Sequence, residues 1–360
     1  MCIKILRNRF MIEQKRIYYF DKLKIFAAIA VIMIHVSAQK WYSAKLMSTE
    51  WMLFTVLDAV SRWAVPIFIM ISGSLFLSRE RGIRHILKNN FLRIITAFVF
   101  WSALYVAADA LQGKEMTFAE GFKDFAGGHY HLWYLFTIAA LYLIVPFLRK
   151  IIESEKLMKY LLIVSFVFSI VLPFAIGILS VYSKYWHTVV NTVSGKINLS
   201  FVRGYLFYFV FGYWLSQKEI SKKMRIIAYI SGFAGAVSIV AFTALASFHT
   251  GKANTVFLNN YTFGCVLESA ALFIFFKYNG DKRTPSERGG KIIRTLSKYT
   301  FGVYLCHVMV LEFISKTLHF DTLSMNPFLS VPLLVFVVGT ASLIITAILN
   351  QIPIIKKYIV

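Results

Sequence analysis

Charged residues are scarce in this 360-residue sequence. Only 16% of the residues are Asp, Glu, Lys or Arg, whereas soluble proteins carry about 25%. Hydrophobic residues make up 58% of the chain, and its mean hydropathy is +0.65. No polar stretch is long enough to fold as a soluble domain. The composition therefore excludes an ordinary soluble protein and predicts a single, all-α integral membrane domain.

Cysteines are few, and the common catalytic signatures are missing. Cys2, Cys265 and Cys306 show no CxxC spacing, so neither a disulfide framework nor a zinc site is predicted. The chain has no GxSxG elbow, no P-loop and no GxGxxG after a strand, and nothing indicates a Ser or Cys nucleophile. His129 and His131 have no acidic or Cys neighbour in sequence, so no metal is expected.

Acidic residues are also in the minority, which leaves a net charge of +22. The Lys and Arg residues lie in short loops between apolar runs and form no groove-sized patch. A nucleic-acid partner is therefore not expected, and anionic membrane lipid is the natural counterpart of these loops.

Apolar runs of about 20 residues are long enough to cross a membrane as helices. The sequence predicts about ten such transmembrane helices, at residues 25–40, 52–77, 92–111, 132–148, 158–178, 201–217, 226–248, 258–277, 297–317 and 331–349.

Alternate loops differ strongly in positive charge. The N-terminal segment and every second loop after it hold 29 Lys and Arg residues, against 8 in the other loops. Because positively charged loops stay in the cytoplasm, both termini are predicted to be cytoplasmic. The predicted division is a basic cytoplasmic segment at 1–24, a transmembrane domain at 25–350 and a short cytoplasmic tail at 351–360.

The first predicted helix carries Lys24 and His35. Eleven residues separate them, which places both on one helix face about 16 Å apart along the axis. This arrangement suits a long anionic ligand that enters from the cytoplasm, with its charged group near Lys24 and its reactive end near His35. Histidine is a natural general base near neutral pH. The alternative is that His35 only packs between helices through hydrogen bonds.

Other polar residues within or beside the spans also have two interpretations. Asp58 and Arg62 are four residues apart and either neutralise each other or hold a polar acceptor. Arg79, Arg81 and Arg93 either orient the chain in the membrane or bind the phosphates of a cofactor.

Two aromatic residues and His307 are further candidates for contact with the acceptor. Trp133 either belongs to an interfacial aromatic belt or helps to position the acceptor. Tyr304 and His307 are three residues apart on one helix face, where they either link helices by hydrogen bonds or contact the acceptor.

Five segments, taken in order, resemble acyltransferase family 3, whose members are multi-pass membrane O-acyltransferases that modify bacterial surface polysaccharides. The resemblance covers residues 16–350. Its segments are Asp21-Lys22-Leu23-Lys24 with His35, Pro66 to Gly73, Phe91-Leu92-Arg93 to Trp101, His131-Leu132-Trp133-Tyr134-Leu135 and Gly302-Val303-Tyr304-Leu305-Cys306-His307.

The resemblance implies acyl-CoA, usually acetyl-CoA, as a cytoplasmic donor, and a glycan or lipid-linked sugar as acceptor, in a bacterial plasma membrane. It implies a catalytic role for His35 and an essential one for Lys24, and less directly cofactor binding by Arg79, Arg81 and Arg93. The family usually has Arg at the position of Lys24, so a charge role carries over better than a bidentate one.

Two other functions stay open at this point. The chain could export a polysaccharide or lipid-linked sugar without acyl transfer, as some relatives are described. It could also serve as a structural component of an envelope-synthesis complex. Partner enzymes and a homo-oligomer are equally open.

Overall fold

The computed structural model describes residues 17–80, 82–197, 202–281 and 285–360, and every regular element among them is helical. Six helical segments are long and apolar enough to cross a membrane, at Thr49–Leu77, Ile83–Leu111, Phe118–Ile152, Glu155–Tyr182, Lys222–Thr250 and Pro327–Leu349. They coincide with six of the ten ranges expected from the sequence. The all-helical membrane fold is confirmed, whereas the count of ten and the cytoplasmic placement of the termini remain predictions.

The other four expected spans also form helices, but these are shorter or more polar. They are α2 (Tyr18–Ala38), α12 (Leu206–Gln217), α14 (Phe263–Asn279) and α15 (Glu287–Thr317). Helices α12 and α14 have 12 and 17 residues, fewer than the approximately 20 that a span requires. Helices α2 and α15 instead carry several ionisable residues, among them His35 and His307.

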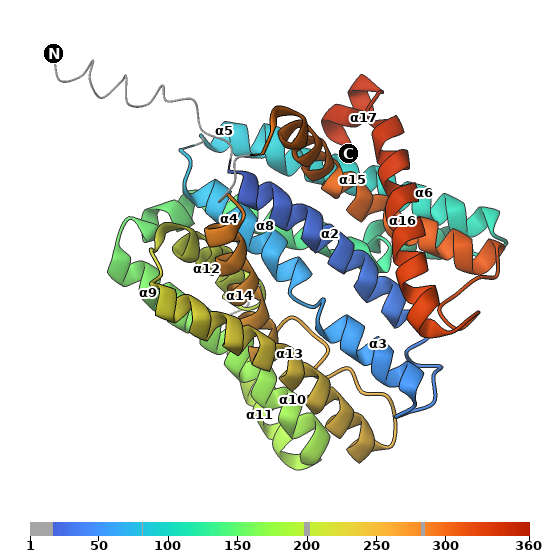
Figure 1. Cartoon of the computed structure of the whole chain (residues 1–360), viewed down its shortest axis with the longest axis horizontal. Helices are drawn as coiled ribbons and strands as arrows, with labels where there is room; N and C mark the ends of the chain where they lie inside the picture. The colour runs from blue at the N-terminus through green and yellow to red at the C-terminus, as the bar shows by residue number, and fades with distance from the viewer. Residues whose placement is uncertain (1–16, 81, 198–201, 282–284) are drawn as a thin grey trace.

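Helix α2 is the central element of the bundle. It packs against α15, α4 (Ala64–Leu77), α16 (Pro327–Leu349), α3 (Thr49–Ala59) and α14, as its place in Figure 1 shows. Its first turn is polar, and the buried Asp21 accepts a 2.6 Å hydrogen bond from the Ser297 hydroxyl of α15. This bond joins the beginning of α2 to α15 and so fixes the depth of Lys24 and His35 relative to α15.

The second expected span is broken, although the sequence indicated one helix over 52–77. Helix α3 ends at Ala59 and α4 (Ala64–Leu77) begins after a turn in which the amide of Ser61 bonds the carbonyl of Asp58. Pro66 lies in the first turn of α4, where the missing N–H would have no helical partner anyway. The proline is thus tolerated because the helix starts again just before it.

Helices α4 and α12 cross at very short range. A Cβ atom on Gly73 would lie 1.8 Å from the carbonyl oxygen of Phe209, and one on Gly212 would lie 2.3 Å from that of Met70. Glycine at both positions lets the two backbones touch, which is a common way for helices to associate in membranes.

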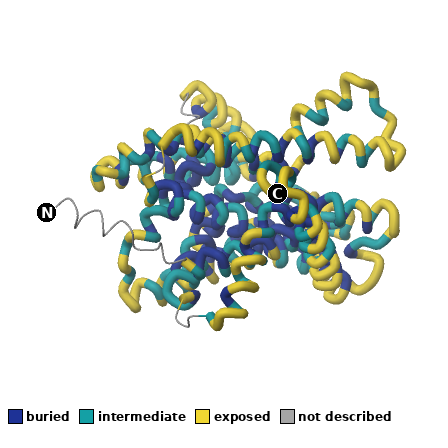
Figure 2. The backbone as a smooth tube through the Cα atoms, turned by 90° about the horizontal axis from the view of Figure 1, so that it is seen from above, coloured by how far each residue is buried: buried dark blue, intermediate teal, exposed yellow. Residues whose placement is uncertain are grey.

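The remaining helices surround this centre, and buried residues concentrate in the middle of the tube in Figure 2. Their bounds are α5 (Ile83–His85), α6 (Leu92–Leu111), α7 (Phe118–Gly127), α8 (Trp133–Ile152), α9 (Glu155–Phe166), α10 (Leu172–Tyr182), α11 (Lys184–Lys196), α13 (Lys222–Thr250) and α17 (Pro353–Tyr358). A π-helical stretch at Ile86–Phe91 leads into α6, another at Val167–Val171 joins α9 to α10, and a 3₁₀ turn at Tyr130–Leu132 precedes α8. Helices α5 and α17 lie at the same end of the molecule (Figure 1).

Candidate active site

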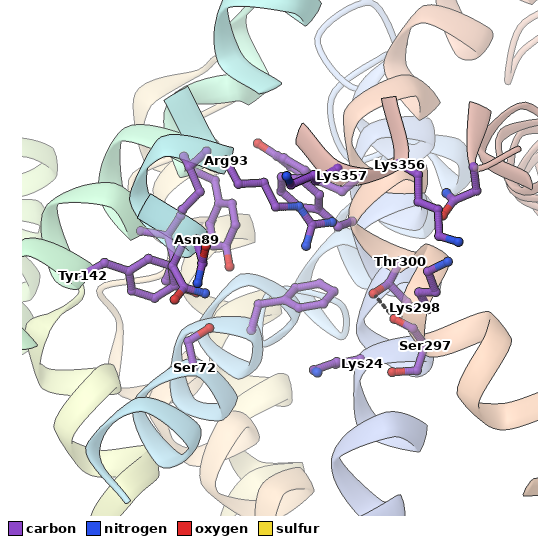
Figure 3. A pocket seen from close by; sticks show the side chains of 18 of the residues that line it. Lys24, Ser72, Asn89, Arg93, Tyr142, Ser297, Lys298, Thr300, Lys356 and Lys357 are labelled. Atoms are coloured by element: carbon purple, nitrogen blue, oxygen red, sulfur yellow. Dashed lines mark hydrogen bonds between the residues drawn. The ribbon is translucent and has the colours of Figure 1, made fainter. Parts of the chain in front are cut away.

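A cavity of about 870 Å³ opens between α2, α4, α6, α8, α15 and α17. Five of the described residues that line it are basic and none is acidic. The basic residues are Lys24, Arg93, Lys298, Lys356 and Lys357. Figure 3 shows them around the cavity, with Lys24 on α2 and Arg93 on α6. The site is thus built to attract an anion.

Lys24 and Arg93 are two of the residues that the sequence singled out for binding the donor. The guanidinium of Arg93 donates a 2.5 Å hydrogen bond to the carbonyl oxygen of Val360 and lies 5.3 Å from the centre of the Phe301 ring. Arg79 does not line the cavity, and Arg81 lies outside the described residues.

Three lysines of the cavity escaped the sequence analysis. Lys356 and Lys357 had been counted only as part of the cytoplasmic tail, and Lys298 only as loop charge. Helix α17 brings the tail back onto α6, where the Thr96 hydroxyl donates to the carbonyl of Tyr358 at 2.6 Å. The adjacent lysines near the C-terminus were a visible signal, but nothing local showed which helix they would face.

Val31 and Tyr304 also line the cavity. Val31 lies four residues before His35 on α2, which is about one helical turn. The Tyr304 hydroxyl donates a 2.5 Å hydrogen bond to the carbonyl of His131, and the Tyr304 carbonyl lies 2.7 Å from Nδ1 of His307. Through Tyr304 the basic cavity therefore adjoins a group of histidines.

These residues, His35, His131 and His307, form what we call the histidine cluster. The ring of His35 lies 5.0 Å from that of His307 and 6.2 Å from that of His131, measured between centroids, and the latter two rings are 5.4 Å apart. They come from α2, from the turn before α8 and from α15. The Tyr130 hydroxyl completes the group, 3.3 Å from Nδ1 of His35.

His307 has one defined tautomer in this geometry. Its Nδ1 faces a backbone carbonyl, which can only accept, so the ring hydrogen is on Nδ1. In a neutral ring Nε2 then keeps a free lone pair. That atom is buried and has no hydrogen-bond partner among the described residues. An unpaired acceptor is costly inside a protein, and its presence beside His35 is typical of a working site.

Three other sequence candidates lie away from the cavity. Asp58 and Arg62 form a side-chain ion pair, with a 2.6 Å bond from Nη2 to Oδ2, and neither lines the cavity. Trp133 stacks on Tyr205 at 5.3 Å between ring centroids and also stays outside it. In the described ranges no group of His, Cys, Asp or Glu residues is arranged to hold a metal ion.

The fold and this site define a membrane protein with a histidine centre beside a cavity lined by basic residues. Comparison with protein families identifies the class. The family model described as an acyltransferase domain, that of acyltransferase family 3, matches residues 17–350, so the chain belongs to this family and is an acyltransferase. Neither the curated proteins nor the solved structures gave a match.

Proposed function

We propose that the protein is a membrane O-acetyltransferase that moves an acetyl group from cytoplasmic acetyl-CoA to a hydroxyl of an envelope glycan or lipid-linked sugar. The observation that carries the proposal is that Tyr304, which lines the basic cavity, also contacts His131 and His307 of the histidine cluster. The family membership supports acyl transfer, and the cavity supports the donor.

The donor proposal rests on charge and reach. The nucleotide end of a coenzyme A thioester carries several phosphate charges, and its thioester lies at the end of a long flexible arm. Arg93, Lys298, Lys356 and Lys357 line the cavity, and their positive charges match the phosphates. Lys24 lines the cavity on α2, about 16 Å below His35 along the helix axis, so the thioester would extend past it towards His35.

The proposed chemistry is direct transfer with His35 as general base. His35 takes the proton of the acceptor hydroxyl as its oxygen attacks the thioester carbonyl. A C–O bond forms, the C–S bond breaks, and the proton passes from the imidazole to the departing thiolate. The surrounding helices exclude water, which disfavours hydrolysis of the thioester.

The acceptor is proposed to approach from the side opposite the cavity. This part of the proposal rests on Tyr130, which is 58% exposed and whose hydroxyl contacts His35. His307 of the cluster and the neighbouring Tyr304 are the proposed contacts of an acceptor hydroxyl. Contacts from Trp133, Asp58 and Arg62 would require a larger acceptor that extends beyond the cluster.

The test is transfer of radiolabel from acetyl-CoA to envelope lipids and glycans, with the protein in native membranes. We expect His35→Ala to abolish transfer while the protein still accumulates in the membrane. His249→Ala, a change at an exposed histidine at the end of α13, is the matched control and should retain activity. Transfer by His35→Ala at the wild-type rate would overturn the mechanism.

The same experiment separates acyl transfer from export. An exporter moves glycan without using acyl-CoA, so loss of the exporter's function would lower the amount of surface glycan. The proposed enzyme predicts that His35→Ala leaves the amount of glycan unchanged and removes only its acetyl groups.

A further inference from the structure

The hydroxyl of Tyr105 is inserted into the backbone of α15. It donates to the carbonyl of Leu305 at 3.0 Å and accepts from the amide of Met309 at 3.1 Å. In a regular helix these two backbone groups would bond to each other. Since a carbonyl only accepts and an amide N–H only donates, the single hydrogen of the phenol points to Leu305.

This direction determines where the neighbouring histidine holds a hydrogen. Nε2 of His131 lies 3.5 Å from the Tyr105 oxygen, whose own hydrogen is already used. A contact at this position can therefore form only if His131 donates from Nε2.

At the other end of the chain of contacts, His129 meets Glu312. Nε2 of His129 lies 3.2 Å from Oε1 of Glu312, and the second carboxylate oxygen lies 3.1 Å from Nζ of Lys316. The lysine favours the ionised carboxylate, which can only accept, so His129 also holds a hydrogen on Nε2.

The two rings meet through their other nitrogens. Nδ1 of His129 and Nδ1 of His131 are 3.1 Å apart, and a hydrogen bond there needs one hydrogen between them. His129 and His131 each hold one hydrogen on Nε2, and one further hydrogen lies between their Nδ1 atoms. The four ring nitrogens of the pair therefore carry three hydrogens. Two neutral imidazoles carry only two. The pair therefore holds one extra proton and one positive charge.

We propose that His129 and His131 share one permanent positive charge held by Glu312, and that this charge keeps His35 and His307 neutral and able to accept a proton. The role assigned to His35 rests on the proposed function. The His131 ring lies 6.2 Å from His35 and 5.4 Å from His307, a range at which a positive charge opposes a second protonation. Glu312 and His129 are thus positioning residues.

Other charged and titratable groups around the pair also affect the electrostatic potential at the histidines. Helix α6 contributes Asp109, which lies 3.7 Å from Lys316 and 3.3 Å from Lys114, and α15 contributes Lys316 itself. Tyr130 lies beside His129 with ring centroids 4.7 Å apart. The charge of Arg62 also reaches His35. None of these groups changes in the variants below.

The test compares the pH dependence of kcat/KM in the wild type, Glu312→Gln and His129→Gln. In Glu312→Gln the carboxylate that stabilises the charged histidine pair is removed, so the pair releases its extra proton. In His129→Gln the charged pair itself is lost, and the negative charge of Glu312 remains. Both changes lower the positive potential at His35. We expect the acidic limb of the profile to move to higher pH in both variants, by about one pH unit and further in His129→Gln.

Asp321→Asn is the matched control, because it removes a carboxylate of similar exposure that pairs with Lys40 outside the cluster. It should leave the profile unchanged. A shift of Glu312→Gln to lower pH would show that the histidine pair is uncharged beside an ionised Glu312, and an unchanged profile would show that no charge of the pair acts on His35. Either result overturns the proposal.

A second measurement does not depend on activity. With histidines labelled by the heavy nitrogen isotope, nuclear magnetic resonance in mildly alkaline buffer should show one imidazolium in the wild type that is absent in Glu312→Gln. Absence of that signal in the wild type would overturn the proposal. If the imidazolium is present but wild-type protein transfers no acetyl from acetyl-CoA, the proposed function fails and the charged pair stands.

Discussion

The basic residues of the cavity should determine the affinity for the donor. Lys356 and Lys357 are exposed residues of α17 that line the cavity, and replacing both by Gln removes two positive charges from it. Each exposed charge facing a phosphate contributes about 0.5–1 kcal/mol in solvent. The double variant should therefore lose roughly 1–2 kcal/mol of binding free energy, which is a rise of about 5- to 30-fold in KM for acetyl-CoA.

The assay is the initial rate of acetyl transfer in membranes or nanodiscs, with acetyl-CoA varied at low and at high salt. The turnover number should change little, because neither lysine contacts the histidine cluster. The increase in KM should shrink at high salt, where the charges are screened over a few ångströms.

A matched control separates this effect from the general role of positive loops. Lys222 and Lys223 are two adjacent, exposed lysines at the start of α13, in a loop predicted to be cytoplasmic, and they do not line the cavity. The same double change to Gln there should leave KM unaltered. An unchanged KM in Lys356→Gln/Lys357→Gln, or an equal rise in the control, would refute the assignment of this cavity to the donor.

Two further predictions concern stability, measured by thermal unfolding of the purified protein in detergent. Gly73→Ala should destabilise the fold by about 3 kcal/mol, because the added Cβ would collide with the carbonyl of Phe209. The control Gly127→Ala adds its Cβ in open space and should leave the stability unchanged. Equal melting temperatures for the two variants would contradict the close crossing of α4 and α12. Asp58→Asn should also cost about 3 kcal/mol, because it leaves the Arg62 charge without its partner, and adding Arg62→Met should restore most of the loss. If Asp58→Asn instead keeps full stability but loses acetyl transfer, the pair serves the acceptor and not the fold.

The sequence was sufficient to predict the class of protein and the placement of Lys24 and His35 along one helix. Scarce charge and long apolar runs predict a helical membrane domain because lipid leaves backbone groups no partner outside the helix. The spacing of Lys24 and His35 follows from helical geometry alone, and the structure has both on α2. The motifs indicated acyltransferase family 3, which the family comparison confirmed.

Other features of the site arise from contacts between distant parts of the chain. The break between α3 and α4 could not be read from hydropathy, because the residues around Asp58 and Arg62 are as apolar as those of a continuous span. The histidine cluster joins three segments, and His129 finds its acidic partner Glu312 far along the chain.

What the sequence alone determined is therefore local or cumulative: membrane class, helix periodicity and the charge of each loop. These properties depend on composition and on spacing along a single helix. What only the tertiary structure decided is which side chains meet. Packing of α17 on α6 turned two tail lysines into the wall of an anion cavity, and insertion of Tyr105 into α15 directed the hydrogens of the neighbouring histidines. Both depend on helix crossings, and a crossing is selected by shape complementarity between surfaces that lie far apart in the sequence.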